Sequence, residues 1–305
     1  MKAIYDVSAP AKLNLFLHIT GRRADGYHLL QSVFMLIDWC DHLHFERRPD
    51  GQFSREDLVG QLPAEDLIVQ AARGLQRAAD CRLGAHIGVE KSIPAQAGMG
   101  GGSSDAASTL LALNRLWELN LPLSELLKIG LSLGADVPFF LQGRNAWVEG
   151  IGETITPIGL PSARFVVIKP PDGLETARIF QSVALKRDTA TAIIAGFAEM
   201  PFEFGCNDLQ SVAQSLSPGV NQGLAWLEAR GLQGRMTGSG SAVYAKIEAK
   251  MNEKMNTKGG ALSGLESPDG SNFSTDGPML KEAPAGFEVR VCENLQEHPL
   301  AGWAT

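Results

Sequence analysis

The sequence predicts a two-domain α+β protein with a phosphate-binding loop. Three observations lead to this fold class. A chain of 305 residues is long for one hydrophobic core. Segments with the period of a strand alternate with segments that have the period of a helix. Four glycines fall within residues 98–102, directly before a helical pattern. We place the domains at residues 1–155 and 156–305.

Composition and charge are those of an ordinary soluble globular protein of enzyme size. Hydrophobic residues make up 44% of the chain and charged residues 20%. A net charge of -7 argues against nucleic acid and membrane surfaces as partners, although local lysines can still meet an anionic substrate. We find no signal peptide and no apolar run near the ~20 residues that cross a bilayer. Four scattered cysteines without a C-x-x-C pair favour a reduced compartment, so we expect a cytoplasmic protein.

The first strand is predicted at residues 9–20, where two sets of side chains alternate. One set is apolar and the other carries two groups that can reach a ligand, Lys12 and Asn14. Alternation alone favours a solvated face for this second set. The apolar set is Leu13, Leu15, Leu17 and Ile19, and the second set is Lys12, Asn14, Phe16 and His18.

The next elements lead to the glycine-rich segment. Residues 33–46 are typical of a strand with a turn near Asp41, and His42 and His44 on it lack a third ligand for a metal site. Residues 57–67 form a turn-rich connection to a helix at 67–79. Residues 86–93 alternate again and form the strand that enters the glycine loop.

Residues 94–108, PAQAGMGGGSSDAAS, predict a phosphate cradle. Ser103, Ser104 and Asp105 are residues that start helices, so the loop opens a helix whose free N–H groups and dipole favour anions. A flexible turn before a helix explains this glycine density poorly. The dinucleotide fingerprint fails because residues 94–97 separate the glycines from the strand. The P-loop fails because the chain has no Gly-Lys-Ser/Thr.

The remaining elements follow in order. A helix is predicted over 119–133 and stops at Gly134; Asp136 then precedes Pro138, where a turn aspartate is the simpler interpretation. A strand at 165–168 and a helix from Thr176 follow, and another helix begins near residue 207. A second glycine-serine loop at 234–244 enters a strand. Residues 249–286 indicate a flexible insertion, and the strand at 287–291 is expected to pair with residues 243–247.

The first glycine loop resembles the central motif P-x-x-x-G-x-G-S-S of the small-molecule kinases named after galactokinase, homoserine kinase, mevalonate kinase and phosphomevalonate kinase. The resemblance implies their two-domain kinase fold, an active site in the interdomain cleft, ATP with Mg²⁺, and Ser103 or Ser104 near the metal, whose ligands stay unknown. It also implies a second loop that packs under the phosphates, at Thr237, Gly238, Ser239 and Gly240. The residues implied in ATP binding are Pro94, Ala95, Gln96, Ala97, Gly98, Met99, Gly100, Gly101, Gly102, Ser103 and Ser104.

Two further segments, 10–15 and 21–28, are similar to one branch of this family, which phosphorylates the 2-hydroxyl of a methylerythritol linked to cytidine diphosphate in the non-mevalonate route to isoprenoids. That resemblance implies catalysis by Lys12 and Asp136. The substrate-binding residues that it implies are Asn14, Tyr27, His28 and Phe180, of which Phe180 is equally suited to the core.

The resemblance also leaves alternatives open. The chain is expected to be a monomer or a homodimer. A homoserine or mevalonate kinase would share the glycine loop but should lack the segment RADGYH at 23–28. A nucleotide-binding sensor without catalysis would lack the lysine or the acid, and both residues are present.

Overall fold

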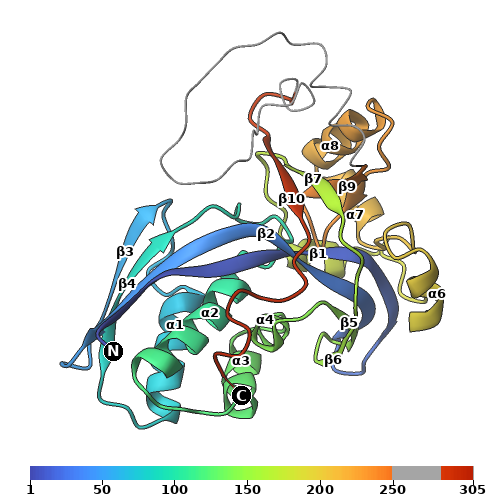
Figure 1. Cartoon of the computed structure of the whole chain (residues 1–305). Coiled ribbons are helices and arrows are strands. Elements are labelled where there is room, and N and C mark those ends of the chain that lie inside the picture. The colour runs from blue at the N-terminus through green and yellow to red at the C-terminus, as the bar shows by residue number, and fades with distance from the viewer. Residues whose placement is uncertain (249–282, 305) are drawn as a thin grey trace.

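The computed structural model describes residues 1–248 and 283–304 (Figure 1). The predicted insertion at 249–286 therefore lies outside the described residues, except for positions 283–286. The helices are α1 (Leu67–Ala78), α2 (Gly101–Leu116), α3 (Leu123–Leu133), α4 (Val137–Gln142), α5 (Thr176–Gln181), α6 (Ile194–Glu199), α7 (Gln210–Leu216) and α8 (Pro218–Glu228). The strands are β1 (Ala3–Arg22), β2 (His28–Arg48), β3 (Phe53–Val59), β4 (Gly84–Glu90), β5 (Ala146–Gly150), β6 (Thr154–Pro157), β7 (Arg164–Lys169), β8 (Arg235–Met236), β9 (Val243–Ile247) and β10 (Glu288–Glu293).

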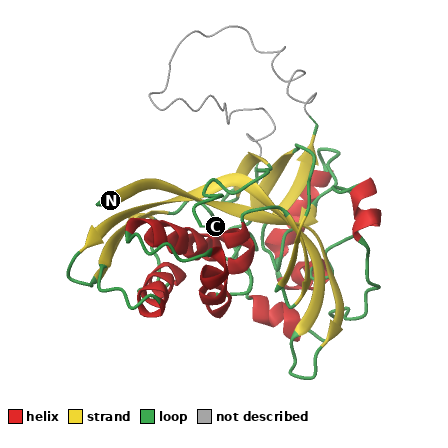
Figure 2. Cartoon of the chain, turned by 60° about the horizontal axis from the view of Figure 1, so that its bottom comes forward, coloured by secondary structure: helices red, strands yellow, loops and turns green. Residues whose placement is uncertain are grey.

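The first sheet holds six strands and is organised on the long antiparallel pair β1 and β2. β4 pairs with one end of β2 and β5 with the other, while β3 and β6 form the outer strands. Helices α1 to α4 lie on one side of these strands (Figures 1 and 2). Their apolar faces bury residues such as Leu75, Leu110 and Phe139 against Phe45 and Val89 of the sheet.

The second sheet has four strands in the order β10-β7-β9-β8, and all of its pairs are antiparallel. The prediction that the last strand pairs with residues 243–247 is wrong. β7 is buried from Phe165 to Lys169 and lies between β9 and β10, so each of its two edges pairs with one of these strands. Closeness along the chain suggested a hairpin, but the central apolar strand determines the order.

β1 is buried on both faces, which corrects the expectation of a solvated face. Lys12 is 4% exposed and Asn14 is 1% exposed. Irregularities in the pairing with β2 follow Pro10 and Asn14, so the strict alternation read from the sequence does not hold along the strand. As a result, Leu13 and Phe16 contribute to one core together with Phe165 and Tyr244 of the second sheet. β1 thus belongs to the cores of both halves of the chain.

The expected turn near Asp41 is also wrong, because β2 runs unbroken through this residue. Asp41 is fully buried, and its Oδ1 accepts hydrogen bonds from the backbone N–H groups of Ser92 (2.6 Å) and Ile93 (2.7 Å). Aspartate is common in turns, yet here it satisfies the backbone of a distant segment. The predicted domain boundary at residue 155 falls within β6. In the described part of the chain, no helix is long and apolar enough to span a membrane.

Candidate active site

A cleft of about 820 Å³ lies where the two halves meet. Its walls come from the middle of β1, the glycine loop, the segment before α4, the start of α5 and the second glycine loop. The predicted site residues that line it are Lys12, Asn14, Pro94, Ala95, Gln96, Ala97, Gly98, Met99, Gly100, Gly101, Gly102, Ser103, Asp136, Phe180, Gly238, Ser239 and Gly240. Four others lie beside or behind it, namely Tyr27, His28, Ser104 and Thr237.

The glycine loop presents bare backbone to the cleft. Gly100 is the residue before α2 and has φ 72°, a left-handed conformation that favours glycine. No side chain caps this helix, and its first helical hydrogen bond runs from the Ser104 N–H to the Gly100 carbonyl at 2.9 Å. The N–H groups of residues 101–103 precede that bond and point out of the helix start. Together with the helix dipole they form an anion site.

The two glycine loops pack directly on each other. A Cβ atom added at Gly98 would lie 2.3 Å from the Thr237 carbonyl oxygen, so only glycine fits there. The Ser241 N–H donates to the Gln96 carbonyl at 3.0 Å, and the Ala242 N–H donates to the Ala97 carbonyl at 3.2 Å. The second loop therefore supports the first one from below, as the resemblance implied.

Lys12 is held at the bottom of the cleft by its neighbours. Its Nζ donates to Asn14 Oδ1 at 2.5 Å and lies 4.7 Å from the centre of the Phe34 ring. The Asn14 Nδ2 donates in turn to Ser32 Oγ at 2.8 Å. Burial lowers the pKa of Lys12, while the charge of Asp136 opposes that shift. Both ends of the Asn14 amide are thus engaged, which makes it an orienting partner of the lysine.

Asp136 faces Lys12 across the cleft. Its Oδ2 lies 3.7 Å from Lys12 Nζ, and its side chain is 32% exposed. Asp136 precedes α4 but makes no capping hydrogen bond to it, so the carboxylate is free of a structural task at this helix. A half-exposed carboxylate beside a buried cation can accept a proton from a hydroxyl group in the cleft.

The residues implied in base recognition are brought together only in part. The rings of His28 and Phe180 lie 5.1 Å apart with an angle of 37° between their planes. Phe180 lines the cleft and also packs against a hydrophobic core. Its position is therefore compatible with both a substrate contact and a structural role. Tyr27 is 62% exposed and touches neither ring in the structure.

The structure contains a buried ion cluster of Lys91, Asp41 and Asp105 that was not predicted from the sequence. Lys91 Nζ forms an ion pair with Asp41 Oδ2 and a second one, at 2.6 Å, with Asp105 Oδ2. Asp41 holds the backbone that enters the glycine loop, and Asp105 lies on α2, the helix that follows the loop, so Lys91 ties the two flanks of the loop together. Burial raises the pKa of the Asp105 carboxyl to about 8, against the opposing charge of Lys91. Since these residues are 50 and 14 positions from Lys91, no local pattern reveals the cluster.

Replacing Lys91 with methionine is expected to destabilise the protein by about 3–5 kcal/mol, because the buried side chains of Asp41 and Asp105 lose the cation that pairs with both of them. Urea denaturation of the purified variant measures this change in the free energy of unfolding. Lys128→Met is the matched control, since Lys128 is exposed and pairs only with Glu125 on the surface of α3. Equal losses for the two variants would contradict the structural role of the cluster.

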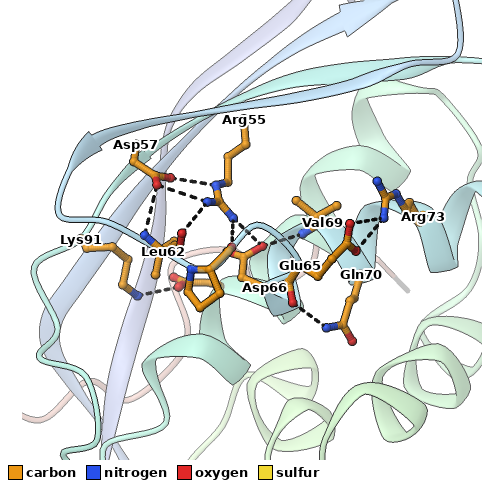
Figure 3. A network of polar contacts seen from close by, with 11 residues as sticks. Arg55, Asp57, Leu62, Glu65, Asp66, Val69, Gln70, Arg73 and Lys91 are labelled. Atoms are coloured by element: carbon orange, nitrogen blue, oxygen red, sulfur yellow. Dashed lines mark hydrogen bonds and ion pairs between the residues drawn. The ribbon is translucent and has the colours of Figure 1, made fainter.

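A second polar network fixes the rim beside α1 (Figure 3). Asp66 caps this helix by accepting from the Val69 N–H at 3.0 Å, and Arg55 Nη1 lies 3.0 Å from the same carboxylate. Arg55 also binds Asp57 through Nε at 2.7 Å. The structure thus engages Asp66 in both capping and ion pairing, which fixes the start of α1.

An anion-binding helix start, a second loop beneath it and a lysine beside a carboxylate define a small-molecule kinase. Two family models agree with this class. Residues 66–144 match the GHMP kinases N terminal domain, and residues 190–254 match the GHMP kinases C terminal domain. The chain is therefore a phosphotransferase that uses ATP.

Individual relatives narrow the class to one family. A 4-diphosphocytidyl-2-C-methyl-D-erythritol kinase of Albidiferax ferrireducens is 63% identical over 304 residues, which cover 100% of this chain and 96% of that protein. A second kinase with this name, from Variovorax paradoxus, is 59% identical and covers 100% of both chains. The chain belongs to the family of 4-diphosphocytidyl-2-C-methyl-D-erythritol kinases.

Solved structures agree with this family and with its fold. A crystal structure of 4-(cytidine 5'-diphospho)-2C-methyl-D-erythritol kinase shares 34% identity with a TM-score of 0.68, and the match covers 79% of this chain and 89% of that one. A mevalonate kinase matches with a TM-score of 0.66 over 95% of this chain and 99% of that one, at 14% identity. The mevalonate kinase therefore supports the fold alone.

Proposed function

We propose that this chain transfers the γ-phosphoryl group of ATP to the 2-hydroxyl of 4-diphosphocytidyl-2-C-methyl-D-erythritol, a step in the non-mevalonate synthesis of isoprenoid precursors. The observation that carries the proposal is the meeting of Lys12 and Asp136 at 3.7 Å on the cleft that the glycine loop lines. The proposed substrate is the compound that the names of the two relatives above contain.

In this proposal, the residues of the first loop, 94–104, hold the triphosphate through backbone N–H groups at the start of α2. Asp136 accepts the proton of the 2-hydroxyl as its oxygen forms a bond to the γ-phosphorus. The bond from that phosphorus to the oxygen bridging to the β-phosphate breaks, and ADP leaves with this electron pair. Lys12 stabilises the negative charge that grows on the transferred group.

The cleft is suited to Mg²⁺ bound mainly through the nucleotide. Among residues 1–248 and 283–304, no three His, Cys, Asp or Glu side chains gather in a way that holds a metal. Mg²⁺ commonly takes one or two protein oxygens and fills its shell with phosphates and water. Ser103 would supply such an oxygen, since it lines the cleft, whereas Ser104 is fully buried. When bound, Mg²⁺ neutralises phosphate charge.

The other end of the cleft is assigned to the cytidine group. Phe180 offers its ring as a stacking surface, and His28 lies against it as a hydrogen-bonding group. We assign the exposed Tyr27, which directly precedes His28, to the same base as a second aromatic surface. Asn14 contributes by orienting Lys12.

An assay of ADP release coupled to a dehydrogenase tests the function. Turnover is expected with 4-diphosphocytidyl-2-C-methyl-D-erythritol at a kcat/KM at least ~10²-fold above that with homoserine or mevalonate, because a cytidine site gains little from either small acceptor. Mass spectrometry of the product should show one added phosphoryl group. Faster turnover of homoserine or mevalonate would reassign the substrate, and tight ATP binding without turnover of any of the three would indicate a sensor.

A further inference from the structure

Arg187 lies behind the histidine that the proposed function assigns to the cytosine ring. It follows α5, and all three nitrogens of its guanidinium donate to nearby acceptors. Nη1 donates to the Leu185 carbonyl at 2.9 Å, while Nη2 donates to the carbonyls of Phe180 at 3.0 Å and Ser182 at 2.8 Å. The remaining Nε donates to His28 Nε2 at 3.0 Å. Three carbonyls of one turn therefore fix the direction of the bond to His28.

This bond determines where the proton of His28 resides. A guanidinium group has five N–H donors, has no acceptor and stays charged at all accessible pH values. His28 Nε2 must therefore accept, and the neutral ring then carries its single proton on Nδ1. A second proton on Nε2 would meet the N–H of Arg187 head-on.

The surrounding charges favour the same neutral form. Burial lowers the pKa of His28, and the charges of Arg187 and of Arg22 on β1 lower it further. These two arginines are the charged groups that act on the ring. His28 is consequently neutral at physiological pH.

The Nδ1–H group remains available for a ligand. Within the part of the chain that the structure describes, neither a side chain nor a carbonyl pairs with this atom, and the ring lies 5.1 Å from the Phe180 ring that lines the cleft. A donor thus stands at the edge of an aromatic surface, which is the arrangement needed to read the edge of a stacked base.

We propose that Arg187 is a positioning residue that fixes His28 as its Nδ1–H tautomer and thereby makes the site select cytosine over uracil. The ring nitrogen N3 is an acceptor in cytosine, whereas in uracil it carries a proton. An Nδ1–H donor therefore pairs with cytosine and opposes uracil, where two donors would face each other without a partner. The choice of base rests on the proposed function, but the tautomer rests on the geometry alone.

Nitrogen-15 NMR of histidine-labelled full-length protein tests the tautomer. The chain has six histidines, and His28→Gln identifies the signal of interest. We expect the unaltered protein to show the shifts of an Nδ1–H imidazole for His28, and Arg187→Met to move them toward the Nε2–H form. An Nε2–H tautomer in the unaltered protein would overturn the proposal, whether or not the substrate assignment holds.

Kinetics with the cytidine substrate and its uridine counterpart test the selectivity. Arg187→Met is expected to reduce the ratio of the two kcat/KM values by about tenfold or more, through KM for the acceptor and not through KM for ATP. Arg187→Lys keeps a donor near Nε2 and should restore much of the ratio. Arg178→Met, at an exposed position of α5, serves as the control. An unchanged ratio in Arg187→Met, in a variant whose Tm shows that it is folded, would refute the role in selectivity.

Discussion

Asp136→Asn is expected to reduce kcat by about 10²–10⁴-fold, the range that a positioned general base contributes. Asparagine has the shape of aspartate but does not accept the proton of an attacking hydroxyl. Because Asp136 makes no capping hydrogen bond to α4, the helix should stay intact. Rates of ADP release at saturating substrates measure the loss, and KM for ATP should change little.

The control for this variant is Asp80→Asn. Asp80 is exposed, does not line the cleft and has φ 47°, which asparagine tolerates. Its kcat should equal that of the unaltered protein. If Asp136→Asn also kept the full rate, the carboxylate would not be the base, and the substrate hydroxyl would have to lose its proton to another group.

Lys12→Met is expected to lower kcat by about 10²–10³-fold, since one charged donor at the developing negative charge is lost. Methionine fills a similar volume, so the packing against Phe34 is largely kept. Single-turnover rates with bound ATP isolate the chemical step. The exposed Lys2→Met variant is the control, and similar rates for the two variants would remove Lys12 from the chemistry.

The pH profile offers a second readout on this lysine. Burial lowers the pKa of Lys12, and the nearby Asp136 opposes this effect. The lysine must be charged to stabilise the transferred group, so the rate should fall on the alkaline side at a pH below ~10.4, the ordinary lysine value. Lys12→Met should lack this alkaline limb.

Much of the fold follows from local patterns. Helix α1 begins after Asp66 as its capping residue and α3 ends at Gly134, so both boundaries are visible in the sequence. The glycine loop is predictable from the sequence because a simple turn before a helix does not explain its glycine density. By contrast, the strand order of the second sheet depends on how deeply β7 is buried, which a short apolar run does not reveal.

Residues of the candidate site that belong to a sequence motif could be predicted. Residues whose role depends on a partner far along the chain could not. Lys12 and Asp136 lie on recognisable segments. Asp41 resembled a turn residue, yet it closes a cluster with Lys91, which lies 50 positions away. Arg187 belongs to no motif in the sequence. Its role arises only when His28, 159 positions away, folds against it.

The main-chain bonds between the two glycine loops have a consequence for how nucleotides enter and leave. Because the Ser241 and Ala242 N–H groups donate to the carbonyls of Gln96 and Ala97, the two halves of the chain are joined at the glycine loops. The two halves cannot separate at this point without breaking these hydrogen bonds. We therefore expect nucleotide exchange to proceed without separation of the two glycine loops.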